Sequence, residues 1–293
     1  MVRAEHLAHA LEGSMLEGRP VIALDVPDSD EVAFVVPCEP GEVLVAWRAA
    51  RGLLDATGRW PVVGCTWGED DYAGLLRHAP DRRAAGVPDD AAFICRGAER
   101  LEFAAVRARR EPNIGVWPPS LQLELTLRYF GSAPAAGEIP DLSGGTYSSG
   151  LPVERYLLDW EMRRPDFADR QQQFAGGIDW FEPAPRVSVV FLPTAKGHEV
   201  PAYLPFFAAW GPGGAEDLIC YLRSWQDRFG AEVVANWGTM LQLAVSRPPA
   251  TPVEALDLAY EHLQMACGTS DETLRHYALR LVDQPRWFLH ERP

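Results

Sequence analysis

The chain has 293 residues, of which 47% are hydrophobic and 23% are charged, and its formal net charge is −14. This composition is that of a globular protein with a sizeable core, and it argues against global disorder. Because so acidic a chain repels phosphate groups, we expect neither nucleic acid nor an anionic membrane as a partner. A basic protein partner would instead be attracted to it.

The cysteines and the N-terminal residues predict a reducing compartment. Five cysteines are widely spaced and odd in number, which is typical neither of a disulfide framework nor of a zinc motif. The start of the chain lacks the basic and apolar regions of a secretory signal, and no run of about 18 apolar residues is present. One lysine, Lys196, among 27 basic residues is typical of a GC-rich bacterial genome. We therefore expect a cytoplasmic bacterial protein without a cofactor.

The N-terminal part predicts short helices and strands in alternation. Helices are expected at 4–11, 42–57 and 70–79, and strands at 20–26, 31–36 and 60–67. The helix at 42–57 has its apolar residues on one face, and Gly58 stands where a left-handed C-terminal residue belongs. Residues 98–110 fit either a helix or a strand. Residues 121–130 predict a strand, because leucines alternate with other residues.

Residues 131–152 are rich in Gly, Ser, Ala and Pro, and they are the clearest boundary in the chain. We expect an N-terminal α+β half over 1–131, a flexible linker over 132–152 and a C-terminal α+β half over 153–293, or one compact domain overall. In the C-terminal half we expect helices at 153–163, 215–229, 251–267 and 269–282, an extended segment at 199–207, and strands at 186–192, 231–236, 240–246 and 287–289.

Capping signals mark the last two helices. Thr251 can cap the first of them, Pro252 suits its first position, and Glu254 completes a capping box. Thr269 and Glu272 repeat the same spacing before the last helix. The two signals predict consecutive helices near the C-terminus.

Two segments about 170 residues apart resemble each other, which suggests an internal duplication. The first segment begins at 31–37 with Glu-Val-Ala, and the second begins at 199–205 with Glu-Val. In both, this run is followed by a predicted helix that ends at glycine, by a Val-Val pair and by Trp-Gly. Chance similarity among common residues is the alternative. The predicted fold is therefore α+β, with a mixed or antiparallel sheet packed by helices and a pseudo-twofold repeat of a strand–helix–strand unit.

No catalytic motif of known spacing is present: the sequence has no phosphate-binding loop, His-Glu-x-x-His, Cys-x-x-Cys or Gly-x-Ser-x-Gly. Weaker candidates are His198 with Glu199, whose side chains would point to opposite faces of a strand. Others are the C-terminal residues His262, Cys267, His276 and His290, which could hold zinc only if they converge. For both, a structural or surface role is the simpler hypothesis, and no metal site is predicted.

Aromatic residues near a glycine-rich loop are the better binding candidates. Tyr203, Phe206, Phe207 and Trp210 precede Gly211–Gly214 and could form the edge of a binding site, with core packing as the alternative. Arginine clusters at 82–83, 107–110 and 163–164 and acidic runs at 25–31 and 69–71 are expected on solvated faces. The alternative for the arginine clusters is an anion-binding pocket, and the alternative for the acidic runs is a site for a hard cation.

The order of elements from Val190 to the C-terminus resembles a bacterial family known as domain of unknown function 4253, with a weaker similarity at 45–68. The resemblance lies in Glu199, Val200, Pro201, Ala202, Tyr203, Leu204, Trp210, Gly230, Ala231, Glu232, Arg247, Pro248 and Pro249. The family has a polar stretch after the tryptophan, whereas Gly-Pro-Gly-Gly follows Trp210 here. The resemblance implies a fold lineage and transfers no catalytic residue.

Three functions remain open from the sequence. We expect a non-enzymatic binding module, such as an acidic immunity-type protein that blocks a basic partner, with binding residues Glu199, Tyr203, Phe206, Phe207, Trp210 and Arg247. The first alternative is a hydrolase or metal-dependent enzyme that uses His198, Glu199 or the C-terminal His/Cys set. The second is a small-molecule sensor with a site between the repeated halves.

Overall fold

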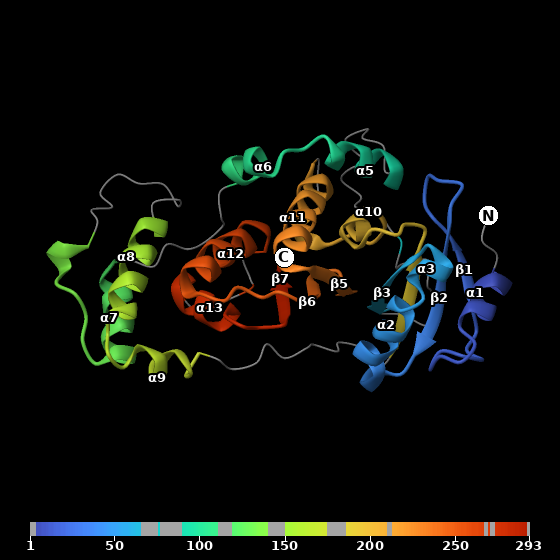
Figure 1. The fold of residues 1–293 in the computed structure, drawn as a ribbon. Helices are drawn as coiled ribbons and strands as arrows, with labels where there is room; N and C mark the ends of the chain where they lie inside the picture. Colours follow the sequence, from blue (N-terminus) through green and yellow to red (C-terminus); the bar gives the residue numbers. More distant parts are fainter. Residues whose placement is uncertain are drawn as a thin grey trace. The chain divides into compact units, whose positions relative to one another are not determined.

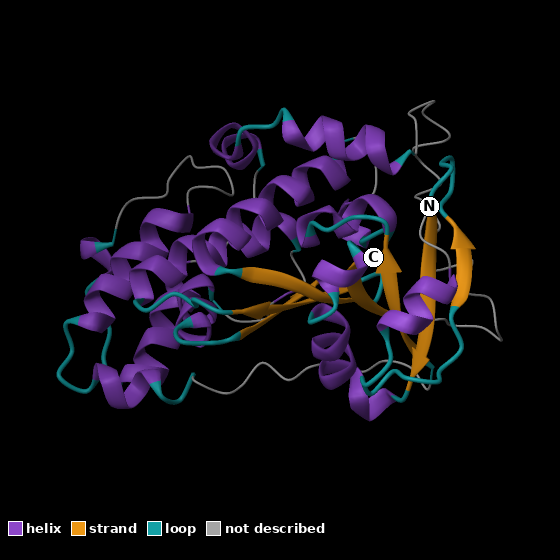
Figure 2. Cartoon of the chain, turned by 45° about the vertical axis from the view of Figure 1, so that its right-hand side comes forward, coloured by secondary structure: helices purple, strands orange, loops and turns teal. Residues whose placement is uncertain are grey.

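The computed structural model describes residues 4–65, 76, 90–110, 119–139, 150–174, 186–209, 213–266, 269 and 273–291. The described residues form an α+β fold with a seven-stranded mixed sheet in the order β1-β2-β4-β3-β5-β6-β7. Figure 1 traces the chain from its blue N-terminus to its red C-terminus, and Figure 2 distinguishes the helices from the strands. The predicted fold class is confirmed. The predicted helix at 70–79 lies outside the described residues, except for Leu76.

The strands and helices have the following bounds. The strands are β1 (Ile22–Asp25), β2 (Val32–Cys38), β3 (Trp60–Cys65), β4 (Val187–Leu192), β5 (Ala231–Asn236), β6 (Met240–Val245) and β7 (Arg286–His290). The α-helices are α1 (Ala4–Ala10), α2 (Val43–Arg51), α3 (Leu54–Thr57), α5 (Ala91–Glu99), α6 (Phe103–Arg109), α7 (Pro119–Phe130), α8 (Gly150–Met162), α9 (Phe167–Gln171), α10 (Val200–Tyr203), α11 (Gly214–Phe229), α12 (Pro252–Met265) and α13 (Leu274–Leu281). Short 3-10 turns are η1 (Pro40–Glu42), η3 (Ala136–Glu138), η5 (Gly197–Glu199) and η6 (Phe207–Ala209).

The chain divides into two compact units that interleave in sequence. Unit 1 comprises Met1–Phe103 and Trp180–Ala244, with Pro293. Unit 2 comprises Ala104–Asp179 and Val245–Arg292. Strands β1 to β6 thus belong to unit 1, except for the last residue of β6, and β7 belongs to unit 2.

Unit 1 is built on a sheet whose central strands are buried along their full length. β4 lies between β2 and β3 and is antiparallel to both, while β3 is parallel to β5. Every residue of β3 and β4 is buried, which explains their continuous apolar sequences. Helices α2 and α11 contact β3 and β5 respectively, and α5 packs against α11. The core therefore lies between the sheet and these helices.

Glycine ends two helices of unit 1 as predicted, but the single helix predicted at 42–57 is divided into α2 and α3. The proposed repeat is incomplete. Gly58 and Gly230 end α3 and α11 in the left-handed conformation, with φ of 63° and 61°. The segment at 199–207 is not extended as predicted: it forms η5, α10 and the start of η6. Pro201 lies in the first turn of α10, where its missing N–H costs no helical hydrogen bond. The second segment therefore lacks a counterpart to β2.

Unit 2 is mainly helical, with α12, α13 and α8 packed on one another and α7 packed on α8. The strand predicted at 121–130 is wrong, because these residues form helix α7. The ambiguous stretch at 98–110 is helical, in α5 and α6. Thr251 caps α12 by accepting a hydrogen bond from the Glu254 amide at 3.2 Å, as predicted.

The cap of the last helix differs from its prediction. Thr273, rather than Thr269, caps α13 by accepting a hydrogen bond from the His276 amide. The hydroxyl of Thr269 instead donates to the carbonyl of Ala266 and accepts from the amide of His290 at 3.1 Å. Thr269 therefore ties the end of α12 to β7 within unit 2.

Candidate functional site

A cluster of ionisable side chains in unit 1 surrounds Glu199, and we call it the Glu199 site. Its members interact electrostatically or by hydrogen bonds: Glu31, Arg59, Asp90, Cys95, Glu99, Thr194, Lys196, Glu199 and Tyr203. They come from the residues before β2 and β3, from α5 and its N-cap, from the turn between β4 and α10, and from α10 itself. Segments far apart in the sequence thus supply one site.

The turn after β4 fixes the Glu199 carboxylate. The Thr194 hydroxyl donates a hydrogen bond to Oε2 of Glu199, and Nζ of Lys196 donates to Oε1 at 3.0 Å. The Lys196 amide in turn donates to the Thr194 hydroxyl at 3.1 Å, and the Glu199 amide donates to the Lys196 carbonyl. Glu199 is 8% exposed, so burial and two charge-assisted or hydroxyl donors hold it in a single orientation.

Gly197 allows this turn to approach the sheet. A Cβ atom at this position would lie 2.4 Å from Cζ2 of Trp60, which is itself buried in β3. The indole N–H of Trp60 donates to the carbonyl of Val233 at 3.2 Å, which holds the ring in place. Glycine is therefore required here by a close approach, and the approach sets the position of Glu199.

Glu31 is one of three exposed members of the site, together with Glu99 and Lys196. Partial burial raises the pKa of its carboxyl group, Arg59 opposes this rise, the charges of Asp90 and Glu199 add to it, and a hydrogen bond from Tyr203 opposes it. Glu31 is exposed as a residue, whereas the Tyr203 ring is buried. An accessible carboxylate thus lies among further negative charges, an arrangement that a bound cation would stabilise.

Arg59 is held in the site by contacts with residues of β2. Its guanidinium donates to the Val32 carbonyl at 2.6 Å and lies 4.6 Å from the centre of the Phe34 ring. The site contains four carboxylates, Glu31, Asp90, Glu99 and Glu199, against the cations Arg59 and Lys196 and a third, Arg96, which lies 4.0 Å from Asp90. The excess charge is therefore negative, which favours a positively charged ligand.

The same surroundings keep the thiol and the phenol of the site protonated. Burial raises the pKa of Cys95 to about 12, with the charge of Glu199 as the next cause. Burial also raises the pKa of Tyr203, and the charge of Glu31 adds to this effect. A neutral thiol is a poor nucleophile, so the site favours hydrogen bonding and ion pairing over nucleophilic chemistry.

The remaining aromatic and basic candidates do not gather at the Glu199 site in the described residues. Phe206 is fully buried, Phe207 is half-buried in η6, and Trp210 lies outside the described residues. Arg247 is exposed and belongs to unit 2. Of the predicted binding residues, Glu199 and Tyr203 are thus the two that the structure brings together.

His198 and Glu199 have different partners, so they do not form a catalytic pair. Nδ1 of His198 lies 2.8 Å from Oε1 of Gln226 on α11, whereas Glu199 contacts Thr194 and Lys196. The Gln226 contact places His198 against α11. The adjacent residues therefore serve separate contacts, although the segment is helical rather than extended.

The C-terminal histidines also lie in separate surroundings within unit 2. Nδ1 of His262 lies 2.8 Å from the Tyr277 hydroxyl, and Nε2 of His276 lies 3.6 Å from Oε1 of Glu161. His290 belongs to β7, and Cys267 lies outside the described residues. Across the described ranges, no group of three or more His, Cys, Asp or Glu side chains could hold a metal ion.

The structure describes some of the charged clusters that the sequence analysis named, and not others. Arg107 pairs with Asp257 and Glu261 at 3.5 Å each, and Arg164 pairs with Asp166 at 3.5 Å. The clusters at 82–83 and 69–71 lie outside the described residues. From the acidic run at 25–31, Glu31 joins the Glu199 site. The sequence analysis missed six members of this site, which carry no local signal of a shared site: Arg59, Asp90, Cys95, Glu99, Thr194 and Lys196.

Residues 188–290 match the model of a family described as Domain of unknown function (DUF4253), as the sequence resemblance predicted. The match includes Thr194, Lys196, Glu199 and Tyr203, whereas Glu31, Arg59, Asp90, Cys95 and Glu99 precede it. No curated protein and no solved structure matched the chain. In the part of the chain that the structure describes, no helix has the length and apolar character that a membrane span needs.

Proposed function

We propose that this chain, which carries a DUF4253 domain over residues 188–290, is a non-enzymatic binding module for a basic protein partner. One observation carries the proposal: the accessible Glu31 carboxylate lies beside the buried Tyr203 hydroxyl, among carboxylates that outnumber the nearby cations. A basic side chain of a partner would pair with Glu31 and relieve repulsion from Asp90 and Glu199.

The charge of the whole chain supports the same partner class. A formal net charge of −14 attracts basic proteins over distances of roughly a Debye length, about 8 Å at physiological ionic strength. Such attraction accelerates encounter, while the Glu199 site would supply the specific contact. An immunity-type role, in which the chain blocks a basic partner, is the form of this function that we propose.

The cysteines support a reducing compartment for this role. Cys38, Cys65, Cys95 and Cys220 are free thiols in the structure. Free thiols persist where the cell keeps cysteines reduced. We therefore propose that the protein acts in a bacterial cytoplasm.

The test is calorimetric titration of the full chain with an oligoarginine peptide as a defined basic probe, at low and at physiological salt. We expect Glu31→Gln to weaken binding by about tenfold, the effect of losing one charge-assisted contact. Asp55→Asn is the matched control, because Asp55 is an exposed acid on α3 of the same unit. Equal binding by both variants would show attraction to overall charge only, and the Glu199 site would then not be the recognition site.

A further inference from the structure

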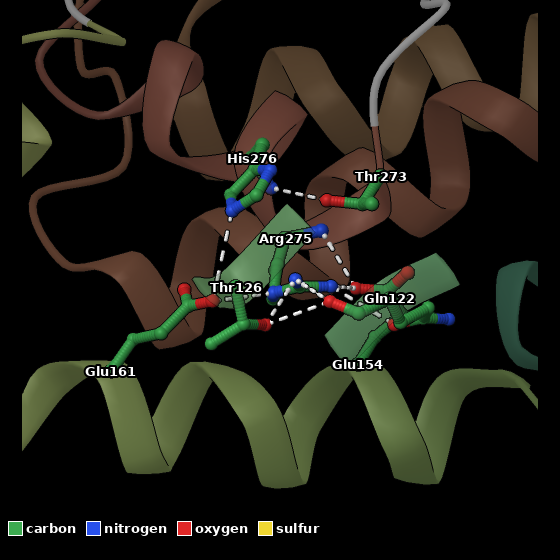
Figure 3. Close-up of polar contacts among 7 residues, drawn as sticks. All are labelled: Gln122, Thr126, Glu154, Glu161, Thr273, Arg275 and His276. Atoms are coloured by element: carbon green, nitrogen blue, oxygen red, sulfur yellow. Dashed lines mark hydrogen bonds and ion pairs between the residues drawn. The ribbon is translucent and has the colours of Figure 1, made fainter. Parts of the chain in front are cut away.

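Arg275 forms the centre of a buried polar network in unit 2. Its guanidinium is 0% exposed and comes from the first turn of α13. Its Nε donates to Oε1 of Glu161 at 2.8 Å, and one terminal nitrogen donates to Oε2 of Glu154 and Oε1 of Gln122, both at 2.9 Å. The other terminal nitrogen donates to the Thr126 hydroxyl at 2.9 Å and to the Gln122 carbonyl at 3.3 Å. Figure 3 shows the residues that make these contacts. The number of hydrogen bonds thus matches the five N–H donors of an arginine side chain.

The partners of Arg275 come from two other helices. Gln122 and Thr126 lie one turn apart on α7, and Glu154 and Glu161 lie two turns apart on α8. Arg275 lies within the residues that match the family model, whereas all four partners precede them. One arginine therefore links the α7–α8 segment to the family domain.

His276 extends the network toward α9. Its Nε2 lies 3.6 Å from Oε1 of Glu161, and its ring stacks on Phe174 with centroids 4.6 Å apart. The Tyr129 ring meets the imidazole edge-on at 4.9 Å. His276 is 2% exposed, so the network has little access to water on this side. The imidazole thus covers the Glu161 end of the network.

Charge makes this network depend on the ionisation of its carboxylates. Arg275 and His276 are the basic groups that face Glu161, and Arg275 faces Glu154. If either carboxylate were protonated, the buried guanidinium would lose a charge-assisted bond that no water replaces at this depth. The contacts between α8 and α13 would then lose their charge-assisted hydrogen bonds.

We infer that the Arg275 network is an acid-released latch that holds the α7–α8 segment on α12 and α13. The direction of the effect is fixed by Glu161. Burial is the largest single effect and raises the pKa of Glu161, but the hydrogen bonds and charges of His276 and Arg275 together outweigh it and hold that pKa below its usual value. A carboxyl whose folded-state pKa is depressed contributes stability above its unfolded pKa and loses it as pH falls through the folded pKa. Acid therefore releases the latch, and neutral pH closes it.

The test is amide hydrogen exchange of the full chain, expressed as protection factors so that the intrinsic pH dependence is removed. Between pH 7 and about pH 2.5, a range that extends well below the ordinary glutamate pKa, we expect protection in α7 and α8 to fall at least tenfold more than in α11 of unit 1. This measurement uses the unmodified chain and needs no variant to fold. Loss of protection in all helices together would indicate general acid unfolding and would overturn the latch.

A pair of variants separates the network from a general charge effect. Glu161→Gln resembles the protonated carboxyl, so its α7 and α8 amides should already exchange faster at pH 7. Glu124→Gln removes a carboxylate from the exposed face of α7 and should behave like the unmodified chain. Equal protection of the two variants at pH 7 would contradict the inference.

Discussion

Removal of the Arg275 guanidinium tests how strongly a buried ion network stabilises unit 2. Arg275→Met preserves the unbranched aliphatic part of the side chain and removes the guanidinium with its five hydrogen bonds. Glu154 and Glu161 are then left buried without the arginine charge. Breaking a buried ion pair by removing one partner costs roughly 3–5 kcal/mol. Because domains are stable by only about 5–15 kcal/mol, this variant should lose a large part of the free energy of unfolding.

The assay is urea denaturation at pH 7, followed by circular dichroism. Arg155→Met is the matched control, because Arg155 is 50% exposed and pairs at 2.9 Å with Asp257, which is 40% exposed. A surface pair of this kind contributes about 0–1 kcal/mol. The triple change of Arg275, Glu154 and Glu161 to Met should recover much of the loss, since it removes the stranded charges. A loss below about 1 kcal/mol in Arg275→Met, equal to the control, would refute the reasoning.

Three further predictions concern single contacts. Gly197→Ala should lower the thermal unfolding midpoint at a cost of roughly 1–3 kcal/mol from overpacking, whereas Gly41→Ala, where the added methyl meets open space, should not. Thr251→Ala should destabilise α12 by about 1 kcal/mol in urea denaturation, and Thr251→Ser should restore the cap; equal stability of both would count against the cap. Tyr203→Phe removes the hydrogen bond that lowers the Glu31 pKa, so carboxyl chemical shifts in an NMR titration should show that pKa rising further; a fall would contradict the assigned contact.

Local sequence signals were sufficient to predict those helices whose ends are formed by residues close together in the chain. The caps at Thr251 and Gly230 and the buried stripe of α11 are properties of contiguous sequence, and they predicted α11 and α12 closely. The same holds for the β5–β6 hairpin, where the amide of Trp237 donates to the carbonyl of Met240 at 2.8 Å. For these elements, short-range chemistry and tertiary packing favour the same structure.

The helix α7 shows where local pattern misleads. Alternating leucines predict a strand, but Gln122 and Thr126 are four residues apart and reach one arginine from the same helical face. That spacing is a helix signal, and it became meaningful only with Arg275, which is about 150 residues away in the chain. Tertiary hydrogen bonding therefore outweighed the period-two pattern.

The Glu199 site was predictable only in part, for the same reason. Glu199 and Tyr203 belong to one turn and were selected together, but Glu31 is brought to them by the order of strands in the sheet. Arg59 and Cys95 occur in ordinary surroundings in the sequence, where a basic residue before a strand or a thiol in a helix carries no signal. Long-range pairing, rather than local composition, assembles this site.

The position of β4 has a consequence for how unit 1 forms during synthesis. β4 is inserted between β2 and β3, yet it follows β3 by more than a hundred residues of chain. As the ribosome extends the protein, the apolar residues of β2 and β3 emerge first, and their shared neighbour is made much later. Until then both strands expose unpaired edges, which is the state in which nascent chains aggregate or require chaperones. The topology of this sheet therefore prevents β2 and β3 from completing their pairing until β4 has been synthesised.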